Sequence, residues 1–302
     1  MVEEIEDLGD VERRYEVIRP MGEGGQGDLF LARDRRSGMR VALKAQKVQG
    51  FESDGYFAEL AAELAAEGAH NRQVALVDAI PRVLAMGRYG RRRCIVLEFI
   101  DGTLLCELMA SHRPIKDVVS IASIIGQLCE IMSAVHELNI AHRDLKPDNV
   151  MVEADGRIRL LDLGLATTMN EATKWGCGTI GYAPPEQLGP QPAGVDQRAD
   201  VFALGCVLLE MTVMHLPYGG HRDGLADEGF PVLPSAPRAE IPAPFERLAL
   251  DMVQRDRERR PADMHAVLAR LRPLLPSPST RRPTKPLTPD PTEYYRSRPA
   301  AR

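Results

Sequence analysis

The stretch AHRDLKPDNV at residues 141–150 combines a histidine, an arginine, a lysine, two aspartates and an asparagine around a single proline. Apolar sequence precedes and follows it, as IASIIGQLCEIMSAVHEL and as NVMV. Because an unpaired polar group is costly to bury, such flanks indicate that these side chains are held by specific partners. Asp144 is a candidate base or orienting acceptor, and Asn149 is a candidate oxygen ligand for a divalent cation.

A second candidate carboxylate is Asp162, in RLLDLGLA at residues 159–166. The apolar run before it predicts a strand that ends here, so that the carboxylate projects from the strand end. An isolated buried aspartate is costly, whereas one that coordinates a divalent cation is not. Asn149 and Asp162 are therefore the predicted cation ligands.

The first part of the chain carries a glycine-rich stretch, GEGGQGDLF, with Gly22, Gly24 and Gly27 in G-x-G-x-x-G spacing. This spacing alone is a weak signal, because it also marks dinucleotide-binding turns and ordinary loops. A dinucleotide-binding turn opens a helix, whereas this stretch leads into two strands, the second reading VALK. Glycines at such a hairpin tip let backbone N–H groups approach a polyphosphate.

Lys44 lies in the second of these strands, between apolar neighbours. It is either an edge-strand lysine that points to solvent or a buried ammonium beneath the glycine-rich stretch, and a buried ammonium requires a carboxylate partner. The next segment, FAELAAELAAEGA, is rich in helix formers and presents Glu59, Glu63 and Glu67 along one face. These three glutamates are the candidate partners.

The elements that position these residues change character along the chain. Strand patterns run from Tyr15 to about Ala45 and return after the helix in IPRVLAMG and RRCIVLEFI. After Gly102, apolar periodicity predicts helices at about 117–138, 198–214, 244–254 and 262–272. From residue 273, PLLPSPSTRRPTKPLTPDPTEYYRSRPAAR is dense in Pro, Ser and Thr and mildly basic. Such composition cannot bury enough apolar surface to fold and predicts a disordered tail.

Composition limits the class of protein. The chain of 302 residues is 44% hydrophobic, and its five cysteines show no C-x-x-C pair, which argues against disulfides and a zinc site and favours a reducing compartment. Its net charge of -5 argues against nucleic acid as a partner. The acidic N-terminus does not resemble a signal peptide, and no uninterrupted apolar run reaches the roughly 18 residues of a membrane span. A cytoplasmic protein without a membrane span in this chain is expected.

Taken in order, the motifs resemble those of a protein kinase, from about Tyr15 to about Leu271. They are the glycine-rich stretch with Leu29, VALK with Lys44, HRDLKPDN at 142–149, DLG at 162–164, GTIGYAPPE at 178–186, DVFALG at 200–205 and DRERRP at 256–261. The resemblance implies an α+β bilobal fold, with a small antiparallel five-stranded sheet and one main helix in the first lobe and a mostly helical second lobe. The predicted organisation is an acidic extension (1–14), an N-lobe (15–100), a C-lobe (101–272) and the disordered tail (273–302).

The resemblance also implies ATP and Mg²⁺ as cofactors and assigns roles to the polar residues. Lys44 would hold the α- and β-phosphates and pair with a helix glutamate, while Asn149 and Asp162 would hold Mg²⁺. Asp144 would accept or orient the proton of the substrate hydroxyl, and Lys146 would neutralise charge on the transferring phosphoryl group. The full set of implied nucleotide contacts is Gly22, Glu23, Gly24, Gly25, Gly27, Leu29, Ala42, Lys44, Glu63, Leu97, Glu98, Ile100, Met151 and Asp162.

The adenine slot is placed by the same resemblance at IVLEFIDG. Leu97 would be the gatekeeper, the backbones of Glu98 and Ile100 would read the base, and Ala42 and Met151 would sandwich it. Ordinary core packing explains the apolar positions nearly as well.

The substrate class follows from two features of the resemblance. Two motifs, DLKPDN and the GT that precedes PPE, resemble the corresponding motifs of Ser/Thr kinases and not those of tyrosine kinases. PPE and RP imply an ion pair between Glu186 and Arg260, which small-molecule phosphotransferases of this fold usually lack. The implied activity is ATP-dependent transfer of the γ-phosphoryl group to Ser or Thr of proteins, as in bacterial eukaryotic-like kinases. A pseudokinase or scaffold, and a phosphotransferase acting on a small molecule, are the alternatives.

Arg143 beside Asp144 implies regulation by phosphorylation of the activation loop. The candidate phosphorylation sites are Thr173, as the first choice, and Thr167 and Thr168. Phosphorylation would occur in trans, within a transient dimer. The alternative is that all three threonines are merely exposed to solvent. Three further residues are expected to be structural: His142, Asp200 and Thr179, the last bonding Asp144 and Lys146.

The chain departs from the family pattern in several places. DFG is DLG here, APE is PPE, and Gln26 stands where an aromatic residue is common. Spacing from Lys44 favours Glu63 as its partner, but Glu67 then occupies a position where an apolar residue is expected. This mismatch indicates either a shifted helix register or an inactive helix position.

Overall fold

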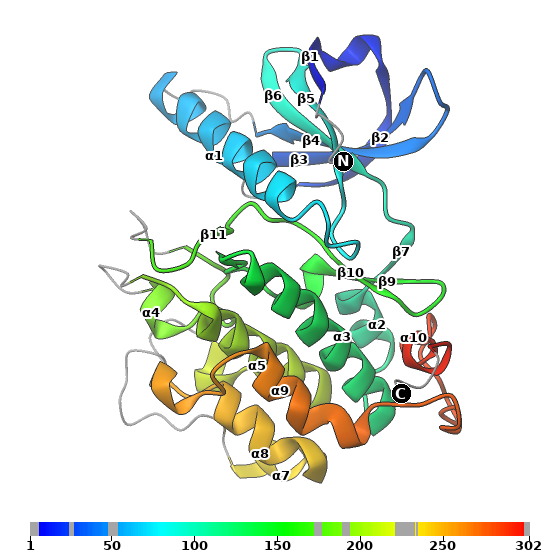
Figure 1. Ribbon diagram of the computed structural model, residues 1–302, viewed down its shortest axis with the longest axis vertical. Coiled ribbons are helices and arrows are strands. Elements are labelled where there is room, and N and C mark those ends of the chain that lie inside the picture. Colours follow the sequence, from blue (N-terminus) through cyan, green and yellow to red (C-terminus); the bar gives the residue numbers. More distant parts are fainter. Residues whose placement is uncertain are drawn as a thin grey trace. The chain divides into compact units, whose positions relative to one another are not determined.

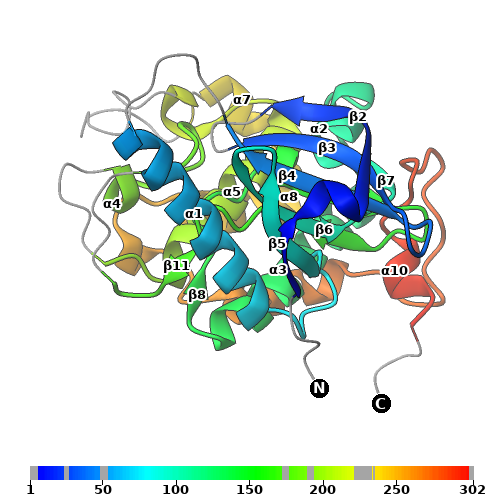
Figure 2. The ribbon, with the colours of Figure 1, turned by 90° about the horizontal axis from the view of Figure 1, so that it is seen from above.

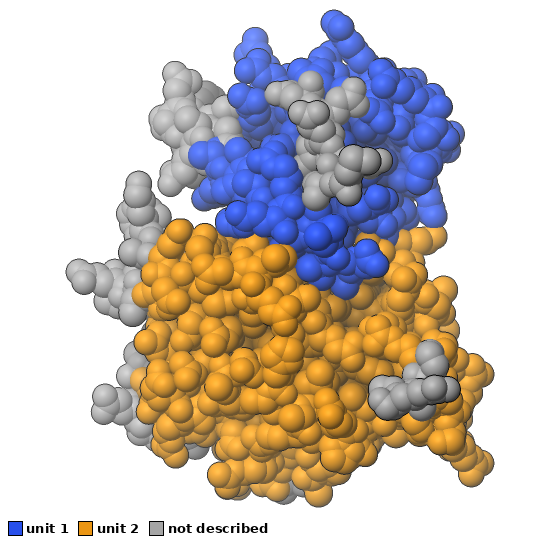
Figure 3. All heavy atoms as spheres, viewed as in Figure 1, with its two compact units in different colours: residues 1–100, 162–164 blue, residues 101–161, 165–302 orange. Residues whose placement is uncertain are grey.

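The computed structural model describes residues 6–23, 27–47, 54–171, 177–188, 194–220, 233 and 235–298. The chain forms two compact units, coloured separately in Figure 3. The first comprises residues 1–100 with 162–164, and the second comprises residues 101–161 with 165–302. The first is rich in strands and the second in helices, which confirms the predicted α+β class.

The first unit is a six-stranded sheet in the order β1-β5-β6-β4-β3-β2, packed against one long helix (Figure 1). Its elements are β1 (Glu6–Asp10), a 3₁₀ turn (Val11–Arg13), β2 (Tyr15–Glu23), β3 (Gly27–Asp34), β4 (Arg40–Gln46), α1 (Asp54–Gln73), β5 (Val83–Tyr89) and β6 (Arg92–Glu98). Helix α1 packs closely on β5 at Gly68, where a Cβ would lie 2.7 Å from Met86 Cε. Figures 1 and 2 both show α1 beside this sheet.

Strand β1 extends the sheet beyond the five predicted strands. It pairs in parallel with β5, with Glu6 opposite Ala85. The chain passes so close to β5 that a Cβ on Gly87 would lie 2.8 Å from Val11 Cγ1 and 3.1 Å from the Gly9 carbonyl oxygen. Val11 is fully buried in the core under the sheet. Residues 6–11 of the predicted acidic extension therefore belong to the folded first unit.

The second unit is organised around α3 (Val118–Glu137), which is buried along most of its length. Asp117 caps its first turn by accepting a hydrogen bond from the Ser120 backbone N–H at 2.7 Å. Helix α3 packs against α5 (Gln197–Val213) and α9 (Met264–Leu271). By length and composition α3 could cross a membrane, but 78% of its most apolar window is buried within the protein, so core packing accounts for its apolarity.

The remaining described elements of the second unit are short strands and helices around this core. They are β7 (Gly102–Leu104), α2 (Leu105–Ser111), β8 (Ile140–Ala141), β9 (Val150–Glu153), β10 (Ile158–Leu160), β11 (Thr167–Thr168), α4 (Pro185–Leu188), α7 (Ser235–Ala239), α8 (Ala243–Met252) and α10 (Glu293–Arg296), with 3₁₀ turns at Pro147–Asn149, Pro217–Gly220, Arg257–Arg259 and Arg272–Leu274. The strands form a β10-β9-β7 sheet and a β11-β8 pair.

The prediction of a disordered tail is wrong for residues 273–298. This segment, drawn from orange to red in Figure 1, ends with α10 and packs on the second unit. Leu287 and Thr292 are buried, although both lie in the Pro-, Ser- and Thr-rich sequence. The composition argument failed because α3 and the β9–β10 turn supply packing partners in addition to the contacts within the segment, such as that between Arg282 and Glu293.

Candidate active site

In the first unit, Lys44 is held between two carboxylates. It lies in β4, opposite Leu29 of β3 and Ile95 of β6, and its side chain is 10% exposed. Its Nζ lies 2.8 Å from Glu67 Oε2 and 2.7 Å from Asp162 Oδ1. Of the two alternatives, the buried ammonium with a carboxylate partner is the one present.

The partner on α1 is Glu67, and the preference for Glu63 was wrong. Glu67 is 2% exposed, whereas Glu63 lies on the exposed side of the helix. Gly68 follows Glu67 and packs against β5, where a Cβ would displace the end of the Met86 side chain. One turn later the buried Asn71 donates from Nδ2 to the Glu67 carbonyl oxygen at 2.9 Å. The mismatch at Glu67 thus reflects a helix register shifted by one turn.

Burial and neighbouring charges shift the pKa values of this group. Burial alone would lower the pKa of Lys44, but Glu67 and Asp162 together raise it above its ordinary value. Burial raises the pKa of Glu67 to about 7, and Asp162 adds to the rise while Lys44 opposes it. The lysine has two anionic partners and Glu67 has one cationic partner, so Lys44 stays charged while Glu67 titrates near neutrality.

We expect this raised pKa to appear in the pH dependence of stability. The folded chain binds the Glu67 proton more tightly than the unfolded chain, whose carboxyl titrates near 4.5, so the stabilisation is complete below that pH and is lost as the pH rises through 7. Relative to Glu67→Gln, the wild type should lose about 2 kcal/mol of unfolding free energy between about pH 5 and pH 8. Native-state hydrogen exchange of the β4 and β6 amides across this range measures the difference. Parallel pH profiles of the two proteins would contradict the assignment.

Asp162 and Arg143 share an uncommon backbone conformation. Asp162 has φ +58° and Arg143 has φ +68°, in the left-handed region that non-glycine residues seldom occupy. Asp162 Oδ1 also accepts from the Gly164 backbone N–H at 3.0 Å. Backbone strain of this kind concentrates at functional sites, and both residues lie in motifs that the sequence singled out.

In the second unit, the Asp144 carboxylate is fixed by four donors. Lys146 Nζ lies 2.8 Å and Asn149 Nδ2 3.1 Å from Oδ2. The Thr179 hydroxyl lies 2.6 Å and its backbone N–H 3.2 Å from Oδ1. Lys146 Nζ also donates to Thr179 Oγ1 at 2.8 Å. The contacts predicted for Thr179 with Asp144 and Lys146 are therefore present.

Asn149 is positioned by the 3₁₀ turn Pro147–Asn149, which folds the chain back toward Asp144. Its Nδ2 donates to the Asp144 carbonyl oxygen at 2.8 Å, and its own carbonyl oxygen accepts from the Leu161 backbone N–H at 2.8 Å. The side-chain contacts of Asn149 with Asp144 use the amide nitrogen and not Oδ1. The described residues contain no cluster of three or more His, Cys, Asp or Glu side chains able to hold a metal ion alone. A cation that phosphate oxygens also bind needs only one or two side-chain ligands, so the roles of Asn149 and Asp162 as cation ligands remain predictions.

Asp200 anchors the backbone that carries Asp144. It is fully buried and accepts from the backbone N–H groups of His142 at 2.9 Å and Arg143 at 2.8 Å. His136 Nε2 lies 2.8 Å from the same carboxylate. Burial alone would raise the pKa of Asp200, but the hydrogen bond and charge of His136 and the other donors lower it below its ordinary value. The sequence identified Asp200 as structural but missed His136, which lies in the last turn of α3.

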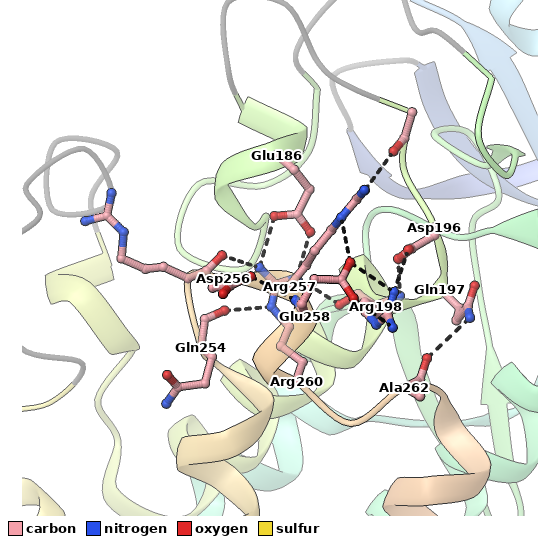
Figure 4. A network of polar contacts seen from close by, with 12 residues as sticks. Glu186, Asp196, Gln197, Arg198, Gln254, Asp256, Arg257, Glu258, Arg260 and Ala262 are labelled. Atoms are coloured by element: carbon pink, nitrogen blue, oxygen red, sulfur yellow. Dashed lines mark hydrogen bonds and ion pairs between the residues drawn. The ribbon is translucent and has the colours of Figure 1, made fainter.

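The Glu186–Arg260 ion pair predicted from PPE and RP is present and bidentate (Figure 4). The two Arg260 Nη atoms lie 2.6 and 3.0 Å from the Glu186 carboxylate oxygens. The same guanidinium donates to the carbonyl oxygens of Gln254, Arg198 and Arg255. It also stacks over the Phe202 ring, 4.9 Å from the centroid.

The glycine-rich stretch is described only at its two ends. Gly22 is the second-to-last residue of β2 and lies opposite Leu29 of β3. Gly24, Gly25 and Gln26 lie outside the described residues, as does the Glu23 side chain. A Cβ on Gly27 would lie 2.5 Å from the Ala45 carbonyl oxygen. Close approach of β3 to β4 therefore explains this glycine without a ligand.

The residues expected at the adenine are distributed over both units. Ala42 of β4 lies opposite the half-buried Leu97 of β6, and Ile100 is buried. The Glu98 backbone N–H donates to the Arg82 carbonyl oxygen at 2.8 Å. Met151 is half-buried in β9 of the second unit. Their contact with a base remains a prediction.

The expected regulatory residues differ in their surroundings. Thr167 and Thr168 form β11 and pair with β8, and both are half-buried. Thr173 lies outside the described residues. The buried Arg143 donates from Nη2 to Cys177 Sγ, and its Nε has no hydrogen-bond partner among the described residues.

Gln187 links the backbone at Arg143 to the backbone at Cys177, and no sequence pattern indicated this role. Its buried Nε2 donates to the Arg143 carbonyl oxygen at 2.7 Å and to the Cys177 carbonyl oxygen at 2.6 Å. A glutamine directly after PPE carries no recognisable signal, because its partners are backbone atoms.

Comparison with known proteins agrees with this geometry. The family model described as "Protein kinase domain" matches residues 15–270. The serine/threonine-protein kinase PknB of Mycobacterium tuberculosis (strain H37Rv) is 29% identical over 273 residues, which are 85% of this chain and 43% of that protein. The serine/threonine-protein kinase pkn2 of Myxococcus xanthus is 27% identical, over 83% of this chain and 31% of that protein.

A third relative, the probable serine/threonine-protein kinase PknB of Lactococcus lactis, is 30% identical over 68% of this chain and 32% of that protein. The chain spans less than half the length of these relatives. None of the five cysteines is joined in a disulfide in the described structure. Together, the matched residues and the two polar clusters show that the chain belongs to the protein kinase family.

Proposed function

We propose that this chain transfers the γ-phosphoryl group of ATP to Ser or Thr hydroxyls of proteins. The observation that carries the proposal is the fixed orientation of the Asp144 carboxylate. It accepts four hydrogen bonds, from Lys146, Asn149 and Thr179. A catalytic base must be held within hydrogen-bond reach of the proton that it accepts. A carboxylate that needed only to be structurally satisfied would not require an ammonium group beside it that contacts the same threonine.

In this proposal Lys44 binds the α- and β-phosphates. Glu67 and Asp162 keep its ammonium charged and extended, since each lies within 2.8 Å of Nζ. Asn149 Oδ1 and the partly exposed Asp162 carboxylate are the proposed Mg²⁺ ligands. Bound Mg²⁺-ATP would supply the phosphoryl group and the cation that spreads its charge.

Lys146 would change partners during the reaction. A carboxylate has about four lone-pair sites, and the four donors on Asp144 occupy them. A substrate hydroxyl must therefore displace one donor, and we propose that it displaces the Lys146 ammonium, whose side chain is 21% exposed. As it moves to the transferring phosphoryl group it neutralises charge there, and Asp144 Oδ2 can then accept the hydroxyl proton.

Ser/Thr specificity and regulation are supported by the relatives and by the surroundings of Arg143. The relatives are named serine/threonine-protein kinases. Arg143 has a buried Nε without a hydrogen-bond partner among the described residues, which a phosphorylated threonine of residues 167–173 would satisfy. We propose that this phosphorylation occurs in trans, within a transient dimer.

Intact mass and phosphosite mapping after incubation with ATP and Mg²⁺ test the proposal. We expect the wild type to gain phosphates on serine or threonine, including Thr167, Thr168 or Thr173, because the chain would be its own first substrate. Lys44→Met should gain none under the same conditions, since it lacks the phosphate-binding ammonium. A gain that depends on protein concentration would support transfer in trans.

Two other outcomes would replace the proposal. If ATP raises the melting temperature of the wild type but no phosphate appears on this chain or on added proteins, a pseudokinase or scaffold is the better assignment. If ATP is consumed only when small hydroxylated metabolites are added, the chain is a small-molecule phosphotransferase.

A further inference from the structure

Residues 287–298, called here the C-terminal strap, lie against a surface that four residues of the second unit define. These are Gly126, Gln127 and Glu130 of α3, and Gly156 in the β9–β10 turn; together they are called the strap site. The family model ends at residue 270, so the strap is an addition to the matched domain. The order of the strap therefore needs its own physical explanation.

The Glu130 carboxylate accepts hydrogen bonds from three side chains of the strap. The Tyr294 hydroxyl donates to Oε2 and the Tyr295 hydroxyl to Oε1, both at 2.9 Å. Arg298 Nη1 also lies 3.1 Å from Oε2, and its guanidinium stacks over the Tyr294 ring, 3.9 Å from the centroid. Burial and the charge of Glu130 raise the pKa of both tyrosines, so their hydroxyls remain neutral donors.

Gln127 forms a hydrogen bond with the backbone of the strap. Its side chain is buried, its Oε1 accepts from the Ile158 backbone N–H at 2.9 Å, and its Nε2 donates to the Gly156 carbonyl oxygen at 3.0 Å. The same Nε2 donates to the Pro291 carbonyl oxygen at 3.2 Å. One carboxamide thus joins α3, the β9–β10 turn and the strap.

Two glycines make room for the strap. A Cβ on Gly126 would lie 2.8 Å from the Tyr295 hydroxyl oxygen and 2.7 Å from Leu275 Cδ2. Gly156 has φ +82°, and a Cβ there would overlap the Asp290 carbonyl oxygen. Both missing side chains therefore coincide with the path of the strap, as in a preformed binding surface.

The charged anchor of the strap is partly exposed to water, unlike the buried Leu287 and Thr292. Pro-, Ser- and Thr-rich sequence has no core of its own and orders only on a surface, at an entropic cost. The anchoring carboxylate is 30% exposed and Arg298 is 52% exposed, so water can replace these contacts after detachment. The Arg260 side chain, by contrast, is fully buried and has no such alternative.

From these contacts we propose that the strap site is a peptide-docking site, separate from the proposed catalytic residues, whose ligand is the chain's own C-terminal strap. The site selects a segment with two adjacent tyrosines followed, three residues later, by an arginine. Docking is reversible. When the strap is undocked, the strap site can bind the same segment supplied as a separate peptide.

Hydrogen exchange of the full chain tests whether the strap is anchored separately. Glu130→Gln preserves the shape of the side chain but removes the charge and one of the two acceptor oxygens. Amides of residues 287–298 should then exchange at least about tenfold faster, while those of α5 and α8 remain unchanged. Glu137→Gln, an exposed carboxylate on the same helix, is the matched control and should leave the strap unchanged. Faster exchange throughout the second unit would show that the strap is an integral part of its core and would overturn the proposal.

Binding in trans is tested with a fluorescent peptide of residues 284–298. The full-length Tyr294→Ala/Tyr295→Ala variant, whose own strap cannot anchor, should bind this peptide at least about tenfold more tightly than the wild type, in which the tethered strap competes. Adding Glu130→Gln to that variant should abolish binding. Circular dichroism verifies that each variant is folded. The docking site is excluded if the folded Tyr294→Ala/Tyr295→Ala variant does not bind the peptide. It is also excluded if binding persists after Glu130→Gln is added. If the Tyr294→Ala/Tyr295→Ala variant does not fold, the strap is an inseparable part of the second unit and the proposal is overturned.

Discussion

Replacing Asp144 by Asn is expected to lower the rate of phosphoryl transfer by about two to four orders of magnitude. The substitution preserves the size of the side chain but removes the negative charge that accepts or orients the substrate proton. It also introduces an NH₂ group among four hydrogen-bond donors, two from Thr179 and one each from Lys146 and Asn149. Neither the charge nor the geometry of the proposed base survives.

The decisive measurement is the single-turnover rate with ATP and Mg²⁺, together with the rise in melting temperature on adding ATP. Because Lys44 and Asp162 are untouched, Asp144→Asn should retain most of the ATP-dependent stabilisation while transfer fails. Asp78→Asn, at an exposed carboxylate in the first unit, controls for the loss of one charge and should leave the rate unchanged. If Asp144→Asn transfers phosphate within about threefold of the wild type, Asp144 is not the proton acceptor.

Several contacts could be predicted from the sequence because they are local or belong to ordered motifs. Thr179, Asp144 and Lys146 meet as expected, and so do Glu186 and Arg260. In each case both partners belong to motifs that carry the resemblance to protein kinases. The kinase resemblance then assigned the partners without any knowledge of the intervening loops.

The errors share a different physical origin. The choice between Glu63 and Glu67 depends on the rotational phase of α1, which is set by packing at Gly68 and not by the regular spacing of the glutamates. Strand β1 reads EDLGD, without the alternation of a half-buried strand, and it is ordered by pairing with β5. The strap likewise depends on α3, 164 residues away at the Tyr294–Glu130 contact. Composition and periodicity report what a segment can do alone, so order that a distant surface induces escapes both.

The largest loss of stability is expected from Glu186→Ala. Removing one partner of a buried ion pair leaves an uncompensated charge and typically costs about 3–5 kcal/mol. The Arg260 side chain is fully buried, while its partner is 13% exposed. Three backbone carbonyl oxygens would still accept from the guanidinium, so we expect about 3 kcal/mol, the lower end of that range.

The slowest-exchanging amides of α5 report this loss, because they exchange only when the second unit opens globally. Glu246→Ala is the matched control, since its ion pair with Arg238 has side chains 44% and 55% exposed, and exposed pairs contribute at most about 1 kcal/mol. The double variant Glu186→Gln/Arg260→Met should recover part of the stability, because no unpaired charge remains buried. If Glu186→Ala and Glu246→Ala cost the same, the bidentate pair does not anchor this segment. If the double variant is no more stable than Glu186→Ala, the contacts of Arg260 with the three carbonyl oxygens and Phe202 stabilise the fold by at least as much as the unpaired charge destabilises it.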